Sequence, residues 1–151
     1  MKINPRKINT FMMLKLPLAW LGGVRVKSIS ETSCIVNIKH RWMNQNPFKS
    51  MFWAAQGMAA EMTTGALVLQ GISDSGRKVS MLVLQQKGVF TKKATGKIRF
   101  ECNDGSLVKE AIEKSSITGE GETVIMKSIG YNSENIPVSN FEFEWTLKVK
   151  A

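Results

Sequence analysis

KSMFWAAQGMAAEMTTGALVLQG, residues 49–71, is the stretch on which the predicted fold depends. It is apolar and rich in small residues, and between Ser50 and Gly71 its only charge is Glu61. Most of the sequence that follows reads as β-strand, so this stretch predicts one long helix in a mostly antiparallel domain. A buried carboxylate costs free energy unless something compensates it, so the position of Glu61 requires an explanation.

Strand patterns flank the predicted helix on both sides. Residues 24–29 and 34–41 precede it, and the first of these alternates apolar and basic side chains. After the helix, residues 79–84 form a run that is apolar except at Ser80, which predicts a strand covered on both faces. Three further strands are predicted over residues 97–102, 123–131 and 141–149. Small residues along the helix would let such a sheet pack closely around it; they are Ala54, Ala55, Gly57, Ala59, Ala60, Gly65 and Ala66.

Shorter helices are predicted near the N-terminus and late in the chain. Asn4 followed by Pro5 is a favourable helix start, and Pro17 should end that helix. Residues 18–21 add a further turn before a pair of glycines. Residues 104–114 are expected to form a short surface helix, and residues 73–76 a turn.

The composition fits one globular domain with an anionic partner. The chain has 151 residues, enough to bury a core, and a formal net charge of +9. Residues 1–100 hold 16 Lys and Arg against 3 acids, whereas the last 51 hold 5 against 9. This bias suits nucleic acid, a membrane surface or a phosphate-bearing small molecule, although it also serves solubility. Cys34 and Cys102 lie in apolar runs and are expected to be buried free thiols in a reducing compartment.

No segment reads as an export signal or a membrane span. The apolar run near the N-terminus is interrupted by Lys15 and Pro17, and no cleavage site follows it. Residues 50–71 reach the roughly 20 residues that a span needs. Their glutamate, glutamine, threonines and small residues suit packing against protein better than contact with lipid. We therefore expect a soluble cytoplasmic protein without membrane insertion.

Few side chains are available for catalysis. His40 is the only histidine, so any histidine-dependent triad would have to use it, and a structural role at the end of a strand is the simpler interpretation. No cysteine or histidine cluster has metal-ligand spacing, no glycine loop is of the phosphate-binding type, and we expect no cofactor. Glu61 either reaches the surface or pairs with a cation, or else it acts as a base in a dry cleft.

Residues 43–65, MNQNPFKSMFWAAQGMAAEMTTG, resemble the signature region of hotdog-fold acyl-CoA thioesterases. In those enzymes a loop with an asparagine leads to His-Gly-Gly at the start of the central helix, and Asp or Glu follows nine residues after the histidine. Here Phe52, Trp53 and Ala54 occupy the helix-start positions, and Glu61 follows nine residues after Phe52. The whole chain resembles an uncharacterised branch of that superfamily which has an extra N-terminal helix and lacks the histidine.

The resemblance implies a fold and a partner. The fold is α+β: a curved antiparallel sheet wrapped around one long central helix, with an extra N-terminal helix, in a single hotdog domain over residues 1–151. Residues 89–96 resemble the corner between strands that follows the helix in that superfamily. Hotdog proteins are dimers with sites at the interface, so a homodimer or a tetramer is expected.

The resemblance also implies a mechanism. The backbone N–H of Trp53 would polarise the thioester carbonyl, and Glu61 would activate water or attack directly. Nine helical residues span roughly 13 Å, whereas a bound carbonyl lies about 3 Å from its donors, so Glu61 would have to come from the partner protomer. Asn46 or Gln56 would orient water or substrate; for Gln56, a purely structural role near the first helical turns is weighted equally.

The substrate is expected to contact both the loop and a basic segment. Phe52 and Asn44 are predicted to line the acyl-thioester site. Residues 77–100 contain seven basic residues and no acid, and our candidates for contacts with the phosphates of coenzyme A are Lys92, Lys93, Lys97 and Arg99. An ordinary solvated edge is the alternative for each. A nucleic-acid role fits less well, because the strand carrying Lys97 and Arg99 shows no interleaved exposed aromatics.

Two other functions remain open on the same fold. The missing histidine allows a non-catalytic acyl-CoA or fatty-acid binding protein. A hotdog dehydratase is disfavoured, because that chemistry pairs a histidine with its acid. Glu61 and its helix carry the preference for an enzyme, since fold similarity alone would not.

Overall fold

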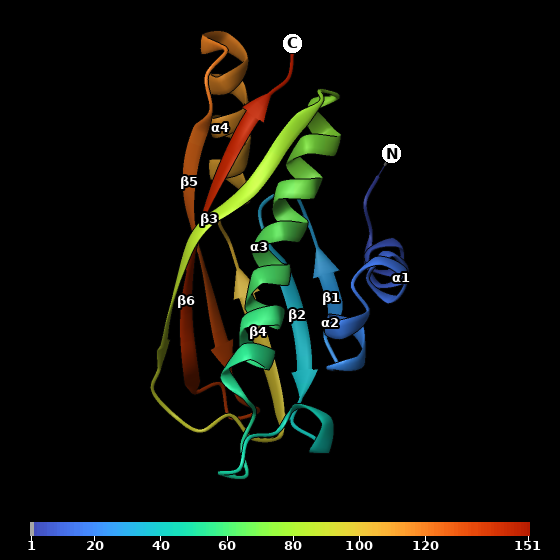
Figure 1. Cartoon of the computed structure of the whole chain (residues 1–151), viewed down its shortest axis with the longest axis vertical. Helices are drawn as coiled ribbons and strands as arrows, with labels where there is room; N and C mark the ends of the chain where they lie inside the picture. Colours follow the sequence, from blue (N-terminus) through green and yellow to red (C-terminus); the bar gives the residue numbers. More distant parts are fainter. Residues whose placement is uncertain (1) are drawn as a thin grey trace.

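The computed structural model describes residues 2–151, and its elements follow the predicted order (Figure 1). The chain begins with the helices α1 (Pro5–Lys15) and α2 (Pro17–Leu21). The Asn4 side chain accepts a hydrogen bond from the backbone N–H of Lys7 at 3.0 Å, and Pro5 occupies the first helical position. Pro17 separates the two helices, because the residue before a proline disfavours helical backbone angles. These features confirm the predicted N-terminal helix.

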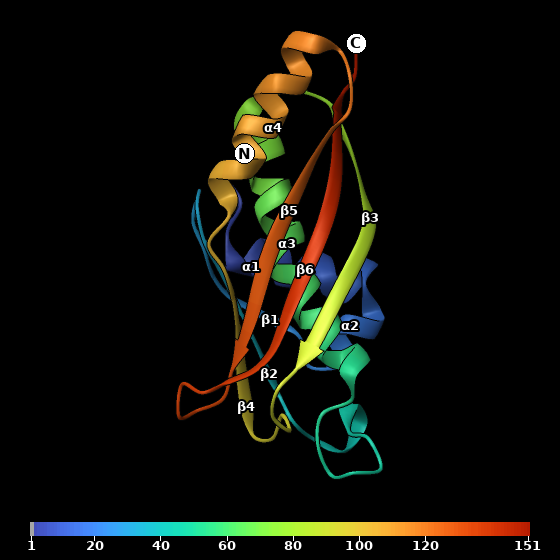
Figure 2. The same cartoon turned by 90° about the vertical axis from the view of Figure 1, so that its left-hand side faces the viewer.

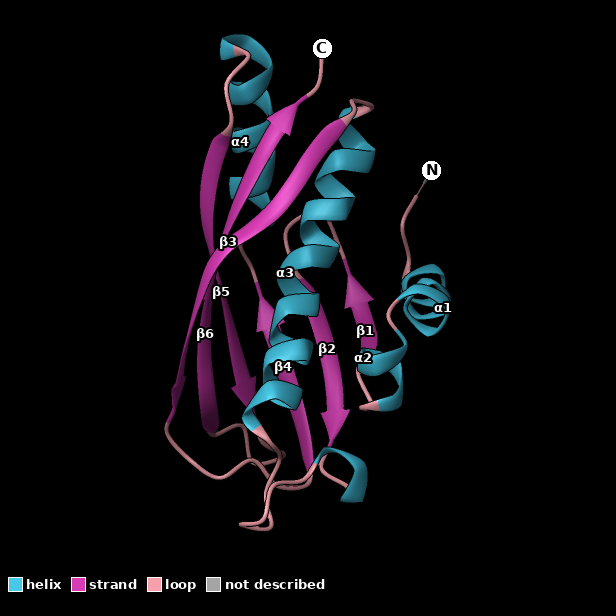
Figure 3. Ribbon diagram, viewed as in Figure 1, coloured by secondary structure: helices cyan, strands magenta, loops and turns pink. Residues whose placement is uncertain are grey.

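Six antiparallel strands form one sheet. They are β1 (Arg25–Ile29), β2 (Cys34–Lys39), β3 (Val79–Phe90), β4 (Lys97–Cys102), β5 (Glu122–Tyr131) and β6 (Pro137–Val149). Their spatial order is β1-β2-β4-β5-β6-β3, so β1 and β3 form the two edges (Figure 3). The second strand ends at Lys39, two residues earlier than predicted, and a short 3-10 helix, η1 (Trp42–Asn44), begins soon after it.

The predicted central helix is α3 (Trp53–Ser75), and β5, β6 and β3 lie across it in Figure 2. It begins later than the stretch that predicted it, because Met51 is held by the preceding loop. Met51 forms an isolated β-bridge with Gln45, and its N–H donates to the carbonyl of Ala94 at 2.8 Å. The helix ends at Gly76, whose φ of 64° is the left-handed conformation that favours glycine. The prediction of a turn over residues 73–76 was therefore wrong for its first three residues.

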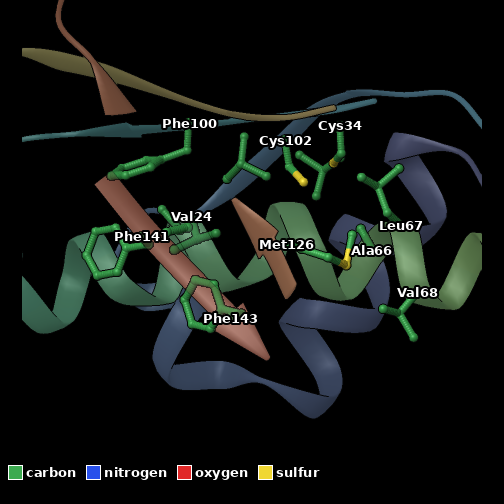
Figure 4. Packing of buried hydrophobic residues seen from close by; sticks show 14 of the residues in the cluster. Val24, Cys34, Ala66, Leu67, Val68, Phe100, Cys102, Met126, Phe141 and Phe143 are labelled. Carbon is green, nitrogen blue, oxygen red and sulfur yellow. The ribbon is translucent and has the colours of Figure 1, made fainter. Parts of the chain in front are cut away.

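The core lies between α3 and the sheet, where Figure 4 shows Met126 and Phe143 beside the helix. The helix contributes small side chains to this contact, as predicted; the fully or almost fully buried ones are Ala55, Ala59, Ala60 and Ala66. Two buried hydrogen bonds also join helix and sheet. The indole Nε1 of Trp145 donates to Thr64 Oγ1 at 3.0 Å, and the hydroxyl of Thr63 donates to Ser128 Oγ at 2.8 Å.

The two cysteines lie opposite each other in the sheet. Cys34 of β2 pairs in register with Cys102 of β4, and both are buried and free. Burial raises the pKa of each thiol to about 12, so both stay protonated at neutral pH. The prediction of buried free thiols is confirmed.

The strand β3 differs from its prediction. We expected residues 79–84 to be covered on both faces, but β3 pairs only with β6 and is an edge. Its inner residues are partly buried, whereas Leu82 and Leu84 are 61% and 51% exposed. The prediction was wrong because a mostly apolar run also suits an edge strand whose outer side chains point away from the chain's own core.

Helix α4 (Gly105–Thr118) ends four residues later than predicted and packs against α3, β5 and β6. Its predicted apolar side is buried through Val108, Ala111 and Ile112. Gly71 of α3 lies so close to α4 that a Cβ atom there would come 2.7 Å from Val108 Cγ1. The C-terminal half of α3 is therefore enclosed by both the sheet and α4.

Candidate functional site

The N-terminus of α3 has no side-chain cap. Phe52 is the N-cap residue, and neither a capping side chain nor an acid in the first turn satisfies the helix start. The first helical hydrogen bond runs from the N–H of Gln56 to the carbonyl of Phe52 at 3.2 Å. The N–H groups of Trp53, Ala54 and Ala55 therefore precede the helical ladder, and the positive end of the helix dipole lies there. This arrangement suits a negatively polarised oxygen.

Two aromatic side chains flank this helix start. Phe52 and Trp53 are 46% and 53% exposed, and their rings meet edge to face with centroids 5.9 Å apart. They stand where the resemblance places a histidine and a glycine. Because both rings are exposed on one chain, they are available to a ligand or to a second protomer.

The asparagines of the preceding loop have structural contacts. Asn44 is buried; its Nδ2 donates to the carbonyls of Gly22 and Lys39, and its Oδ1 accepts from the N–H of Arg41. Its own carbonyl accepts from the N–H of Phe52 at 2.8 Å. Asn44 therefore holds the helix start in place. It does not reach a ligand directly, because both hydrogens of its amide are already donated.

Asn46 shapes the next turn of the same loop. Its Oδ1 accepts hydrogen bonds from the N–H groups of Phe48 and Ser50, and its Nδ2 donates to Ser50 Oγ at 3.0 Å. These bonds fix the chain around Lys49, whose φ of 59° is left-handed. In the described structure Asn46 is thus engaged within the loop that positions α3.

Gln56 has one free polar atom. The side chain is 4% exposed, and its Nε2 donates to the carbonyl of Met51 at 3.2 Å. Its Oε1 is buried and has no hydrogen-bond partner among residues 2–151. A buried acceptor left without a donor costs free energy, so this oxygen is suited to accept a hydrogen bond from water or substrate.

Glu61 lies two turns further along α3, on a stripe with Gly57 and Gly65. Those two glycines lie against β6: Cβ atoms added to them would be 3.8 Å from Phe141 Cε1 and 3.5 Å from Trp145 Cζ2. The Glu61 side chain reaches the surface between them, and among residues 2–151 it forms no ion pair or hydrogen bond. Partial burial nevertheless raises the pKa of Glu61 above its ordinary value.

The structure separates the basic residues that the sequence grouped. Lys92 and Lys93 lie in the exposed loop after β3, and Lys93 Nζ donates to the carbonyl of Phe48 at 3.3 Å, beside the helix start. Lys97 and Arg99 lie on β4 and alternate with the buried Ile98, so they point away from α3. Arg99 is also paired with Glu101 at 2.7 Å. Only the first pair is placed near the candidate site.

His40 follows β2 and is partly buried. Its backbone N–H donates to the carbonyl of Gly96 at 2.8 Å, which ties the end of β2 to the start of β4. This contact agrees with the structural role expected at the end of a strand, but the ring Nε2 is buried and has no partner among the described residues.

Sequence reasoning missed one part of this region, the edge strand β3. Its outward Leu82 and Leu84 were assigned to a covered strand, so a surface was overlooked. Across residues 2–151, no three His, Cys, Asp or Glu side chains are grouped to hold a metal ion. None of the helices in the same described range is long and apolar enough to cross a membrane.

Comparison with known proteins places this geometry in a family. The family model described as a domain of unknown function, DUF4442, matches residues 5–147. A search of curated proteins returned no match. A protein of unknown function from Pseudomonas aeruginosa, named a probable thioesterase, is 19% identical with a TM-score of 0.83, and the match covers 97% of each chain.

Two other solved structures have the same architecture. A protein of unknown function from Chlorobaculum tepidum is 16% identical with a TM-score of 0.82, over 97% of this chain and 98% of its own. A thioesterase from Haemophilus influenzae is 10% identical with a TM-score of 0.74, over 99% of this chain and 93% of its own. At such identities these matches establish the fold, and the predicted α+β hotdog architecture is confirmed.

Proposed function

The chain belongs to the DUF4442 family, and we propose that it is an acyl-CoA thioesterase which acts as a homodimer. One observation carries the proposal: an unpaired carboxylate, Glu61, with a raised pKa lies on the open stripe of a helix whose N-terminus is also uncapped. Thioester hydrolysis needs both parts, a base or nucleophile and a site for the oxyanion. The solved structures that are named thioesterases support this reaction class.

The edge strand supports the dimer. β3 has 12 residues, pairs on one side only, and exposes Leu82 and Leu84. A long edge strand with unpaired backbone groups and exposed apolar side chains is a template for another strand. Antiparallel pairing of β3 with its copy would satisfy those groups. A two-fold axis across the strand would also make the two copies of α3 antiparallel, so one helix start would approach the partner's Glu61.

In the proposed mechanism the thioester carbonyl oxygen accepts a hydrogen bond from the Trp53 N–H. Glu61 of the second protomer removes a proton from water as the water oxygen bonds to the carbonyl carbon. The carbon–sulfur bond then breaks, and the thiolate of coenzyme A leaves and takes up the proton. Gln56 Oε1 would accept the other hydrogen of the attacking water and so orient it.

Lys92 and Lys93 are the basic residues that we assign to the phosphates of coenzyme A. Both are exposed in the loop beside the helix start. Lys97 and Arg99 point to the outer face of the sheet, so we leave them out of this contact. Phe52 and Trp53 would then form the walls of the entrance for the acyl group.

A second candidate is an acyl-CoA or fatty-acid binding protein without turnover. The observation that favours it is the bulk of Phe52 and Trp53 at the helix start, where the resemblance places histidine and glycine. In this case the uncapped helix would bind a carboxylate or thioester, and Glu61 would have no chemical role.

The test is thiol release from a panel of acyl-CoAs by the native protein and by Glu61→Gln. We expect the substitution to lower turnover by about 10²- to 10⁴-fold, the usual contribution of a general base. Glu110→Gln, an exposed carboxylate on α4, is the matched control and should leave turnover unchanged. Unchanged turnover in Glu61→Gln would remove Glu61 from the mechanism. Tight acyl-CoA binding without turnover in the native protein would favour the second candidate.

Subunit mixing tests whether the site is shared between protomers. Trp53→Pro removes the proposed donor together with the indole ring, and proline is well tolerated at the first helical position. Trp53→Pro and Glu61→Gln should each be inactive. In a random mixture half the dimers are heterodimers with one intact site, so activity should return to about a quarter of the native value. No recovery in the mixture would mean that both groups act within one protomer.

A further inference from the structure

A second surface lies where α2 meets η1, on different elements from the Glu61 stripe of α3. Four large apolar side chains project there without cover from the described chain. We call it the α2–η1 surface; its members are Leu18, Leu21, Trp42 and Met43, which are 74%, 56%, 81% and 55% exposed. Figure 1 shows α2 and the segment after β2 on the same side of the molecule. Side chains of this size are unusual in such numbers on a free surface.

This surface is held by defined contacts. The Asn44 amide donates to the carbonyl of Gly22 at 3.0 Å, and Arg41 Nη2 donates to the carbonyl of Leu21 at 3.1 Å. Both bonds join η1 and its N-cap to the end of α2. Residues of α2, η1 and the segments beside them form a groove of about 440 Å³, which is lined by Trp20, Leu21, Arg25, Arg41, Trp42 and Met43. The exposed side chains therefore project from a fixed base.

Two arginines share this groove. The guanidinium of Arg25 lies 3.3 Å from the ring centroid of Trp20, and its Nη1 donates to the carbonyls of Trp20 and Val24. Neither Arg25 nor Arg41 forms an ion pair with any residue from 2 to 151. Burial, and secondly the charge of Arg41, lower the pKa of Arg25. The two cations are thus close together, with no carboxylate to balance them.

The sequence around this surface is also positively charged. Residues 1–60 contain nine Lys and Arg and a single acid, Glu31. Glu31 lies in the turn between β1 and β2 and lines a different cleft, together with Gly71 and Asp74. The α2–η1 surface therefore combines exposed apolar side chains with uncompensated positive charge.

This combination selects among possible occupants. A second copy of the same surface would bring the arginines of both copies together, which electrostatic repulsion opposes. A purely apolar partner would leave Arg25 and Arg41 without an anion. A bilayer with anionic lipids offers phosphates to the arginines and an interfacial region to tryptophan, which favours that position in membranes.

We infer that the α2–η1 surface docks on anionic lipid bilayers, with Trp42 and Leu18 entering the interface while Arg25 and Arg41 bind headgroup phosphates. Only side chains enter the lipid, so the docked protein stays peripheral. This surface is separate from Glu61, and its function does not depend on thioester hydrolysis.

Co-sedimentation with vesicles tests the inference. The full chain should bind phosphatidylcholine vesicles that contain phosphatidylglycerol, and it should bind pure phosphatidylcholine far less. Trp42→Ser and Arg41→Gln should each weaken binding to the anionic vesicles by at least about fivefold. Ile117→Ser is the matched control, because Ile117 is 85% exposed on α4 and should not contribute.

Two results would overturn the inference. If Trp42→Ser binds the anionic vesicles as well as the native protein does, the binding is nonspecific attraction by a chain of net charge +9. A change of oligomeric state in Trp42→Ser, with vesicle binding unaltered, would assign the surface to contact between protein chains. Circular dichroism should show that each variant folds, which is expected because the Trp42 side chain is largely in solvent.

Fluorescence locates the docked surface directly. Brominated phosphatidylglycerol should quench the tryptophan emission of the native protein, and Trp42→Phe should reduce that quenching to the part contributed by Trp20, which lines the same groove. Trp145 is buried and serves as an internal reference that bromine does not reach. Equal quenching in the native protein and in Trp42→Phe would place the contact elsewhere and reject the α2–η1 surface.

Discussion

The two long sides of α3 differ in what covers them. On one side the sheet buries Ala59, Ala60 and Leu67 almost completely, and no charge lies among them. On the other side Gly57, Glu61 and Gly65 form a stripe that reaches solvent beside β6. A helix that only filled a core would need no such stripe. The difference indicates that one side of α3 stabilises the fold and that the other side is kept open for contact.

Leucine-to-alanine substitutions on α3 test that division with the largest expected effect. Leu67 is 1% exposed, so Leu67→Ala should lower the free energy of unfolding by about 2–5 kcal/mol through lost burial and a cavity. Leu69 lies two residues away and is 37% exposed, so Leu69→Ala should change the free energy of unfolding by less than about 1 kcal/mol. Urea unfolding measures both. Similar losses in the two variants would mean that a partner covers the second side.

Glycine-to-alanine substitutions test the same division with a smaller effect. At Gly71 an added Cβ would meet Val108 at 2.7 Å, so Gly71→Ala should destabilise the protein by about 1–3 kcal/mol. At Gly57 the nearest side-chain atom would be 3.8 Å away, and alanine there should stabilise the helix by about 0.5–1 kcal/mol. Thermal unfolding of the two variants should shift in opposite directions. A loss at both positions would show that the stripe is closely covered.

The smallest expected effect is the pH dependence of stability at Glu61. Its folded-state pKa is raised by burial, so the charged form destabilises the folded protein at neutral pH. This penalty disappears as the pH falls through the raised pKa, because the folded protein then takes up the proton. Glu61→Gln should therefore be slightly more stable than the native protein near neutral pH, and the gap should close on acidification.

Urea unfolding at several values from about pH 4 to about pH 8 measures this gap, because the range extends below the ordinary pKa of a glutamate and the amide does not titrate there. Glu110→Gln serves again as the control, because Glu110 is exposed on α4. A gap that stays constant across this range would mean that the substitution acts through packing, without any contribution from proton uptake.

Local patterns predicted most of the fold. Asn4 with Pro5, and the alternation of residues 141–149, depend on neighbours in the sequence, and the structure has the corresponding helix and strand. The apolar run of β3 was assigned the wrong burial, because the sequence does not reveal which strand lies at the edge of a sheet. The start of α3 was placed too early because Met51 is held by Ala94, a contact across 43 positions.

The candidate site was predictable only in part. The spacing of Phe52 and Glu61 placed one at the helix start and the other on the helix, and the structure has Phe52 as the N-cap and Glu61 on α3. The contacts of Asn44 and Asn46 were not predictable, because an amide that binds substrate and one that binds the backbone of its own loop look the same in a sequence. Arg25 and Arg41 were missed for a similar reason, since their approach depends on how α2 meets η1.

The position of β3 has a consequence for synthesis on the ribosome. β3 pairs only with β6, the last strand of the chain, so it has no partner until residues 137–149 have left the ribosomal tunnel. Until then the nascent chain displays a 12-residue strand whose first half is largely apolar, with both edges unpaired. Contacts between such distant segments form slowly. Residues 91–136 are therefore made while β3 is open to chaperones or to the same strand of a neighbouring nascent chain.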